Sequence, residues 1–533
     1  MANSLNRRGF NATAGATLLS QSAWMRFAHA NWIQTPKQIF GLMSGEVTSE
    51  SAVVWGRSDV DSRMLVQWDT AASFTSPRSV MGPKVTQLTD FTAKTVLSDL
   101  PAGETIYYRV AFENDGGLSD SLQGSFRTQG DSASSSAQED VFFAWSGDTA
   151  GQGFGINLEW GGMKIYSAIA SLSPQFFIHS GDMIYADNII EEELKLRDGT
   201  IWKNLVTPAK SHVASSLDDF RGNYLYNLMD SNVQDFHSRV PLIVQWDDHE
   251  TTNNWYPQQR LQSRKDKDRY DAMEYGQQLA NRAKQAFFEY TPLLPQASGE
   301  RRIYRQIHRG PMCDLFVLDL RTYRGPNSNN LQTEPSEASS ILGAEQLAWL
   351  KNALHKSRAV WKIICCDMPI GIPVGDSMEG KGFYEAVGNG DNGKPLGREL
   401  EFLDLLRWIK ESGVSNTVWI TADVHYAAAH FYDPKRSAVP DAFKPFWEFV
   451  AGPLHAGSFG PNALDGTFGP EVKFQWAPPP GSKLPLAPSD GLQSFGTIRI
   501  DAKSHRCTVE LRGLDGQVLD GGSFTLEPNQ DAH

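Results

Sequence analysis

Six short apolar runs in the sequence each end on an aspartate. They cover residues 141–148, 176–182, 242–248, 315–319, 361–367 and 418–423. Their content of Val, Ile, Phe and Trp is typical of strands that are buried on both faces of a sheet. Ligands of such sheets bind beyond the carboxyl ends of the strands, so the pattern predicts up to six carboxylates around one crevice. Because unpaired carboxylates at close range repel one another, we expect a multivalent cation among them.

Two of these strand ends carry further groups that bind metals. Tyr185 follows Asp182 by three residues, so a turn or helix would place the phenol beside a carboxylate that can bridge two ions. Asp423 and His425 are two residues apart and lie on one side of an extended chain. Each motif also has a structural alternative, which is a turn aspartate beside a packed tyrosine in the first case and a packed histidine in the second.

The segment 246–254 concentrates polar groups after the third apolar run. It offers the carboxylates of two aspartates and of Glu250, an imidazole and the amides of Asn253 and Asn254 within eight residues. Together these groups offer metal ligands and a proton donor. The alternative is a charged surface loop.

Composition and charge narrow the classes of function. The chain has 533 residues, of which 40% are hydrophobic and 21% charged, as is ordinary for a soluble globular protein with two or more domains. Its net charge of −13 would repel duplex nucleic acid but not a small phosphate ester drawn to a metal ion, although solubility alone equally explains the charge. Four cysteines without a CxxC motif predict neither a disulfide framework nor a thiolate zinc site. After the N-terminal stretch, no segment reaches the ~18 apolar residues of a membrane helix, so we expect no membrane span.

The first 30 residues have the features of an export signal. Arg7 and Arg8 form a twin-arginine pair, residues 12–24 are mildly apolar, and residues 28–30 fit an A-x-A cleavage site. We therefore expect the twin-arginine machinery to export the protein to the periplasm or the exterior, with a mature chain that begins near Asn31. The alternative is a frayed amphipathic N-terminus.

Two domains are expected after this signal. Residues 39–128 contain the alternating apolar and polar runs of a small all-β unit, and residues 130–140 form a polar linker. Beyond them, strands alternate with helix-like stretches, which indicates α/β layering. The segments 189–239 and 260–290 are polar and longer than ordinary connections, and we expect them to be helical insertions above the site.

Taken together, the motifs resemble the metallophosphoesterase superfamily, and within it the alkaline phosphatase D (PhoD-like) family. They occur in the family's order at residues 147–157, 179–187, 246–254, 319–324, 422–425 and 452–457. The resemblance implies an α/β (α+β) fold with a layered β-sheet core flanked by helices, preceded by a small all-β sandwich like that of fibronectin III. The implied domains are a twin-arginine signal peptide (1–30), the N-terminal sandwich (38–130) and a metallophosphatase catalytic domain (140–525).

The resemblance also implies a ligand set for a first metal ion. Asp148, Asp182, Tyr185 and His425 would bind this ion, with Asp182 as the bridge to a second one. PhoD-like enzymes are associated with Fe³⁺ and Ca²⁺, and a phenolate with an imidazole suits iron. Asp148 stands where the family pattern has a cysteine, which leaves the identity of the first metal open, with zinc and manganese as the other candidates.

The second ion would be bound mainly by carboxylates. Asp248 replaces an asparagine ligand of the superfamily and Asp423 replaces a histidine, so this position gains oxygen ligands that suit a hard cation such as Ca²⁺. In the same comparison, His249 corresponds to the catalytic imidazole.

Three further residues are candidates for substrate binding. Arg321 has the guanidinium that matches a phosphate bidentately, and its alternative is a buried ion pair with Asp319. Asn254 lies at the end of the third motif. His455, in a glycine-rich loop, either faces the substrate or only packs.

The sequence thus predicts an exported, metal-dependent phosphoesterase of the alkaline phosphatase D type. It would hydrolyse phosphate monoesters, diesters or both with a metal-bound hydroxide, while His249 hydrogen-bonds the phosphate or protonates the leaving group. The alternatives are a phospholipase D-like phosphodiesterase with the same site and a non-catalytic periplasmic protein that binds a metal or another ligand. The natural ester, the oligomeric state and the pH optimum are left open.

Overall fold

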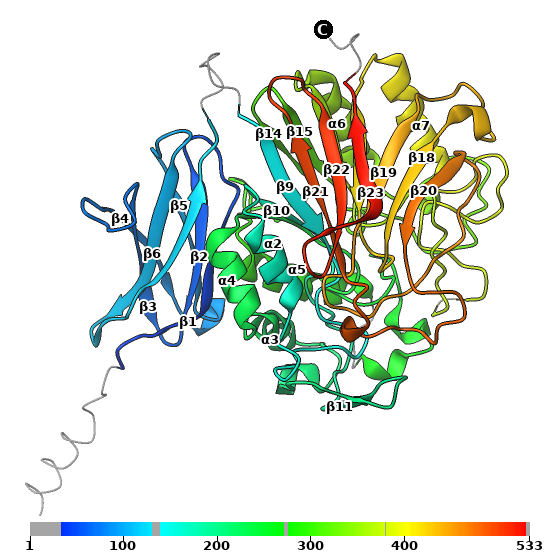
Figure 1. Ribbon diagram of the computed structural model, residues 1–533. Helices are drawn as coiled ribbons and strands as arrows, with labels where there is room; N and C mark the ends of the chain where they lie inside the picture. Colours follow the sequence, from blue (N-terminus) through cyan, green and yellow to red (C-terminus); the bar gives the residue numbers. More distant parts are fainter. Residues whose placement is uncertain (1–33, 131–138, 271–274, 379, 529–533) are drawn as a thin grey trace, which may run out of the picture.

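The computed structural model describes residues 34–130, 139–270, 275–378 and 380–528. The predicted export signal and most of the predicted linker lie outside these residues. The described chain forms an N-terminal β-sandwich, blue in Figure 1, and a larger domain in which sheets and helices are layered.

The N-terminal sandwich consists of two facing layers of strands. One layer contains β4 (Arg78–Val85), β3 (Ser62–Asp69), β6 (Thr105–Asn114), β7 (Gly117–Leu118) and β8 (Leu122–Arg127). The other layer contains β1 (Gln38–Gly45), β2 (Ala52–Ser58) and β5 (Thr92–Leu97). Alternate residues of β3, namely Met64, Val66 and Trp68, are buried in the core between the layers. The predicted all-β unit is therefore present.

The sandwich shares a sheet with the larger domain. Strand β1 pairs in parallel with β13 (Leu242–Gln245) at Gly45 and Leu242, which joins the strands into a nine-stranded sheet in the order β23-β22-β21-β9-β10-β13-β1-β2-β5. A Cβ atom on Gly45 would lie 2.4 Å from the carbonyl oxygen of Leu242 and 2.5 Å from Pro292. Glycine at position 45 therefore permits the close approach of the two strands.

Two sheets pack face to face in the larger domain. The nine-stranded sheet contributes β9 (Val141–Ser146), β10 (Phe177–Ser180), β13, β21 (Ser494–Ile500), β22 (Cys507–Gly513) and β23 (Val518–Leu526). The seven-stranded sheet contains β14 (Arg305–Arg309), β15 (Cys313–Val317), β16 (Trp361–Cys365), β17 (Thr417–Thr421), β19 (Phe446–Val450), β18 (Ala427–Tyr432) and β20 (Pro470–Trp476). Apolar side chains of both sheets, among them Phe143, Ile178, Leu315 and Ile363, form the core between them.

The six apolar runs are strands, as predicted, but they belong to two sheets. The first three form β9, β10 and β13, and the last three form β15, β16 and β17. The expected crevice therefore lies where the carboxyl ends of two sheets meet.

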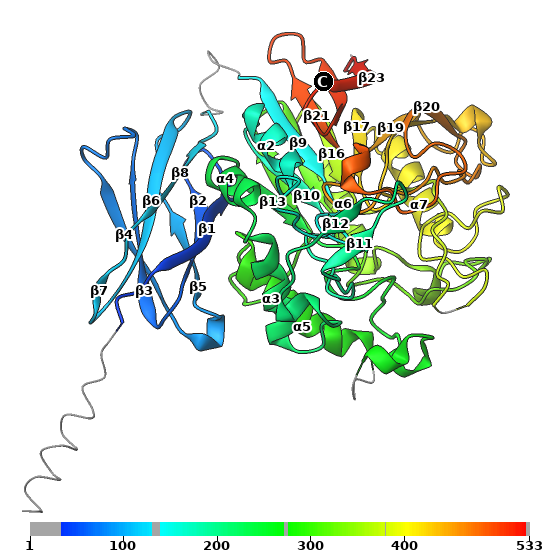
Figure 2. The same cartoon turned by 60° about the horizontal axis from the view of Figure 1, so that its bottom comes forward.

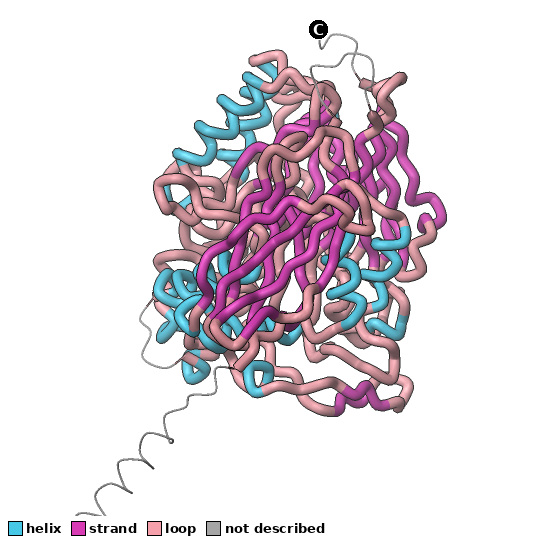
Figure 3. Tube along the Cα trace, turned by 90° about the vertical axis from the view of Figure 1, so that its left-hand side faces the viewer, coloured by secondary structure: helices cyan, strands magenta, loops and turns pink. Residues whose placement is uncertain are grey.

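Helices cover the outer faces of both sheets (Figures 1 and 2). The nine-stranded sheet is covered by α2 (Lys164–Ser171), α3 (Leu217–Asn227), α4 (Ser231–Arg239) and α5 (Gly276–Tyr290). The seven-stranded sheet is covered by α6 (Ala344–Lys356) and α7 (Glu399–Glu411). In Figure 3, which looks onto the N-terminal sandwich, helices lie to the left and right of the strands. The sheet order and the helices packed on each sheet confirm the predicted layered fold.

The first predicted insertion is only partly helical. It begins with a small hairpin of β11 (Glu193–Lys195) and β12 (Ile201–Lys203), followed by a short 3-10 helix (Pro208–Lys210), and α-helix appears only from α3 onward. Trp202 of this hairpin is 2% exposed and packs against Phe154, so apolar contact fixes a stretch whose polar composition indicated a helix. Among the described residues, no helix has both the length and the apolar content needed to cross a membrane.

Candidate metal centre

Loops at the carboxyl ends of strands from both sheets position the candidate ligands. Asp148 follows β9, Asp182 follows β10, and Asp423 and His425 follow β17. All four residues have positive φ angles, between 53° and 68°. Such a backbone costs on the order of 1–3 kcal/mol per residue and persists only where the surroundings enforce it. Its repetition at three strand ends indicates a site whose geometry is set by the fold.

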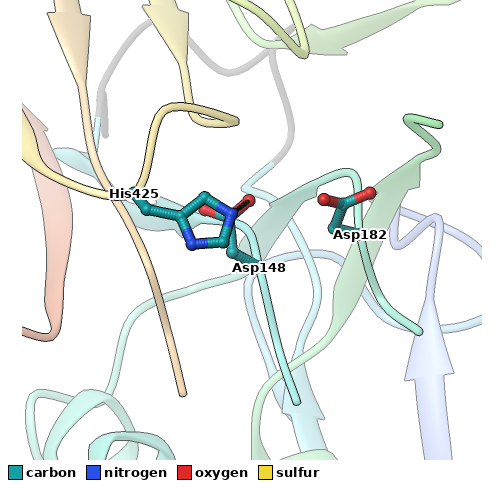
Figure 4. A group of neighbouring side chains, drawn as sticks. All are labelled: Asp148, Asp182 and His425. Atoms are coloured by element: carbon teal, nitrogen blue, oxygen red, sulfur yellow. Dashed lines mark ion pairs between the residues drawn. The ribbon is translucent and has the colours of Figure 1, made fainter. Parts of the chain in front are cut away.

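Asp148, Asp182 and His425 form the first ligand group (Figure 4). One ligand atom from each lies within 4.8 Å of the others. The Nε2 atom of His425 lies 3.6 Å from Asp148 Oδ1, and its Nδ1 lies 2.5 Å from the carbonyl oxygen of Gly457. Because a carbonyl only accepts hydrogen bonds, Nδ1 carries the proton and Nε2 is left as a ligand atom. The hydroxyl of Tyr185 lies 2.8 Å from the same Nε2, which adds a phenol to the group.

Two further ligand groups adjoin the first. One consists of Asp182, Asp248 and His249, and the other of Asp247, Asp248 and Asp423. Asp182 is therefore shared with the first group, and Asp248 is shared between the second and the third. The structure thus brings together the six residues that the sequence proposed as metal ligands.

The charges of these groups fit bound cations. Burial raises the pKa values of Asp148, Asp182 and Asp423 well above the usual value, and neighbouring aspartates raise them further. Asp148 Oδ2, Asp247 Oδ2 and Asp248 Oδ1 have no hydrogen-bond partner among the described residues. Buried carboxylates with such unpaired oxygen atoms are expected to be paired with charges or to coordinate metals.

Glu250 connects two of the ligand loops. Its carboxylate accepts the backbone N–H groups of Asp182 at 3.2 Å, Met183 at 2.7 Å and Asp247 at 2.9 Å. This residue is fully buried and belongs to none of the three ligand groups. It positions Asp182 and Asp247 relative to each other.

His249 is oriented by an aspartate that the sequence analysis did not assign. Its Nδ1 lies 2.6 Å from Oδ1 of Asp187, and its ring stacks on Tyr185 with centroids 4.3 Å apart. Burial by itself lowers the pKa of His249, but the charges of Asp187 and Asp248 outweigh this effect and raise the pKa to about 10. The negative charge of Asp187 therefore favours the protonated imidazole, which is the form that can donate a proton. Asp187 lies within the motif 179–187, but its spacing alone gave it no role.

Arg321 does not occupy the predicted position of a phosphate clamp. Its side chain is fully buried, its Nε lies 2.6 Å from Asp247 Oδ1, and its Nη1 donates to Glu385. It also lies 4.0 Å from Asp367. A guanidinium engaged by carboxylates on several sides is not free to bind substrate. The predicted alternative, a side-chain pair with Asp319, is also absent here, since Asp319 accepts the backbone N–H of Arg321.

The other two predicted substrate contacts have different environments. Asn254 lines the cleft, and its backbone N–H donates to Asp248 Oδ2 at 2.6 Å. His455 is 1% exposed, lies 3.0 Å from the carbonyl oxygen of Gly155 and packs against Trp160 and Trp202. His455 therefore packs, which was the alternative to a substrate contact.

A cleft of about 680 Å³ opens over the ligand groups. Its floor contains Asp182, Asp248, His249, Glu385, Asp423 and His425. Its remaining lining is Gln152, Asn253, Asn254, Pro373, Val374, Gly375, Val424, Phe459, Gly460, Pro461, Asn462, Ala463 and Leu484. Glu385, which lies in the irregular stretch between β16 and α7, was not anticipated because no neighbouring motif marks it.

Comparisons with known proteins place the chain in a family of phosphatases. Residues 143–511 match the family model of the PhoD-like phosphatase, and residues 25–130 match that of the PhoD-like phosphatase N-terminal domain. Alkaline phosphatase D of Bacillus subtilis (strain 168) is 26% identical over 284 residues, which cover 50% of this chain and 44% of that protein. The match thus spans less than half of that relative.

The fold is also similar to solved structures. A structure of PhoD matches with a TM-score of 0.66 and 18% identity over 92% of each chain. The purple acid phosphatase PPD1 from yellow lupin seeds matches with a TM-score of 0.56 and 13% identity, over 93% of this chain and 75% of that one. At these identities the similarity concerns the fold alone.

Proposed function

The chain belongs to the PhoD-like phosphatase family, and from this premise we propose that it is a metal-dependent phosphoesterase acting on phosphate monoesters, diesters or both. The observation that carries the proposal is that Asp182 and Asp248 are each shared between adjoining ligand groups. Shared carboxylates create neighbouring positions for two cations, as two-metal hydrolysis of phosphate esters requires.

The donor atoms differ between the two positions, which favours two different metals. We propose Fe³⁺ at the position of Asp148, Tyr185 and His425, since a phenol and an imidazole suit iron. We propose Ca²⁺ at the position of Asp248 and Asp423, where the donors are carboxylate oxygens. When bound, the ions would act as Lewis acids on the phosphoryl oxygens and on the attacking water.

The chain itself supplies the proton. His249 lines the cleft, and its Nδ1 is paired with Asp187, so Nε2 is the nitrogen left to donate to substrate. The buried pair with Asp187 favours the charged imidazole, which can donate to a phosphoryl oxygen or protonate the departing alkoxide.

Export is a separate part of the proposal, supported by the sequence alone. Arg7, Arg8 and the residues 28–30 fit a twin-arginine signal followed by a cleavage site. Replacing both arginines with lysine should leave the unprocessed protein in the cytoplasm. Normal processing of the double variant would contradict this route.

The activity is tested by turnover of p-nitrophenyl phosphate and bis-p-nitrophenyl phosphate. We expect release of p-nitrophenol from at least one of them, lost on chelation of the metals and restored on their return. A strong preference for the diester would favour the phospholipase D-like alternative. Metal binding without turnover of any ester would favour the non-catalytic alternative.

A further inference from the structure

The walls of the cleft are apolar or carry amides, in contrast to the charged floor. We propose that the cleft selects phosphate esters whose organic part is uncharged and weakly polar, so that one phosphate group is the only anion of the preferred substrate. This inference rests on the proposed phosphoesterase function and adds the class of substrate to it.

One wall is formed by the loop that carries Phe459 and by the segment around Leu484. The ring of Phe459 meets the ring of His425 edge-on, with centroids 5.2 Å apart. The backbone N–H of Phe459 donates to the carbonyl oxygen of His425 at 3.3 Å. Reciprocal backbone hydrogen bonds of 2.9 and 3.0 Å between Ser458 and Leu486 join the two segments. Leu484 lines the cleft and is 40% exposed. This wall therefore presents an aromatic and an aliphatic side chain beside a proposed metal ligand.

The second apolar wall contains Pro373 and Val374, both partly exposed. The carbonyl oxygen of Val374 accepts the backbone N–H of Glu385 at 3.0 Å, so the wall is fixed to the floor. The opening between these walls suits an aliphatic or aromatic group, whose burial is favourable by about 25 cal/mol per Å² of apolar area.

Amides supply the remaining polar groups of the walls. Gln152, Asn253 and Asn462 line the cleft and offer neutral donors and acceptors. Such groups suit hydroxyl or carbonyl groups of a substrate. They do not neutralise a second phosphate.

Three cationic side chains, those of Arg321, Lys265 and Arg269, have partners within the protein. Arg321 lies buried against Asp247 and Glu385, Lys265 donates to the carbonyl oxygen of Ser377, and Arg269 donates to that of Asp187. Among the described residues that line the cleft, none is a lysine or an arginine. A second phosphate group would therefore enter without the guanidinium or ammonium partner that usually binds it.

Turnover of three esters tests this inference separately from the proposed function. Fructose 6-phosphate and fructose 1,6-bisphosphate differ by one phosphate group, and p-nitrophenyl phosphate adds an apolar leaving group. We expect kcat/KM to be at least about tenfold lower for the bisphosphate than for the monophosphate, because its second charge stays unpaired. Because p-nitrophenolate is the better leaving group, turnover of p-nitrophenyl phosphate tests only the proposed phosphoesterase function. Equal kcat/KM values for the two sugar phosphates would overturn this inference and leave the proposed function standing. If no ester is turned over, both the proposed function and this inference are rejected.

Added charges test the cause of the preference. Leu484→Lys and, at an exposed position of the same wall, Ala463→Arg each place a cation at the cleft. Each should narrow the preference for the monophosphate about two- to fivefold, the value of an exposed ion pair. Leu118→Lys is the matched control, since Leu118 is 55% exposed in the N-terminal sandwich and the substitution changes the net charge equally. An unchanged preference in both folded cleft variants, or an equal change in the control, would overturn the inference.

Discussion

Asp187 and His249 form a buried pair in which Oδ1 of the carboxylate lies 2.6 Å from Nδ1 of the imidazole. The other oxygen of Asp187 accepts the backbone N–H of Asn253 at 2.8 Å. A carboxylate fixed through both oxygens determines the orientation of the ring and the nitrogen that remains free. Asp187 is therefore a positioning residue for His249.

Substitutions in this pair should reduce turnover to different extents. His249→Ala should reduce turnover by roughly 10²–10⁴, as expected for a general acid–base group. Asp187→Asn should reduce it by roughly 10–10², because the imidazole remains but loses its orienting charge. Steady-state kinetics with metal analysis test both, and Asp115→Asn on the exposed surface of the sandwich is the control. Metal content should stay at the wild-type level. Loss of an ion from His249→Ala would instead make His249 a ligand, as its grouping with Asp182 and Asp248 also allows.

The different donor sets of the two metal positions predict that single substitutions affect them separately. If the first ion is Fe³⁺, coordination by Tyr185 should give the protein a charge-transfer colour, and Tyr185→Phe should bleach it and weaken iron binding while the Ca²⁺ requirement persists. Asp423→Asn should raise the Ca²⁺ concentration needed for activity and keep the colour. Asp182→Asn should weaken both ions, because its carboxylate belongs to two ligand groups.

Absorbance, metal analysis and Ca²⁺ titration distinguish these outcomes. A colourless wild-type protein that contains only zinc would reject the iron assignment and leave the phosphoesterase proposal standing. Equal loss of both ions in all three variants would show that the ligands are divided differently.

The environment of Arg321 predicts a loss of stability rather than of substrate affinity. Arg321→Met leaves Asp247 and Glu385 buried without their cation, which should lower the free energy of unfolding by about 3–5 kcal/mol. Urea unfolding of the metal-loaded protein measures this change. Arg321→Lys keeps the charge and should recover part of the loss. If Arg321→Met instead unfolds like the wild type but has a strongly raised KM, Arg321 binds the phosphate of the substrate, as first predicted.

The sequence was most informative where backbone pattern and chemistry coincide. Apolar runs that end in aspartate identified Asp148, Asp182 and Asp423, because a parallel strand fixes where its carboxyl end lies. The division of these strands between two sheets was not visible, since a strand buried in either sheet has the same composition.

The roles of residues that act through tertiary contacts could not be predicted from the sequence. Asp187 reaches His249 across 62 residues, and Arg321 reaches Glu385 across 64. No periodicity relates positions that far apart. Arg321 and His455 were candidate substrate contacts by residue type, but burial decides their roles, and burial depends on the packing of the whole domain.

The shared sheet predicts that the sandwich and the larger domain unfold together. Gly45 pairs with Leu242 at the joint, and a methyl group on residue 45 would meet Leu242 and Pro292 at 2.4–2.5 Å. Gly45→Ala should therefore destabilise the protein by about 1–3 kcal/mol, as overpacking does. In Gly130→Ala, the control, the added Cβ meets no atom closer than 3.9 Å among the described residues. Urea unfolding followed by tryptophan fluorescence and by circular dichroism should give one transition for the wild type and a single shifted one for Gly45→Ala. Two separate transitions, of which only one shifts, would show that the domains are stable independently and that the joint does not couple them.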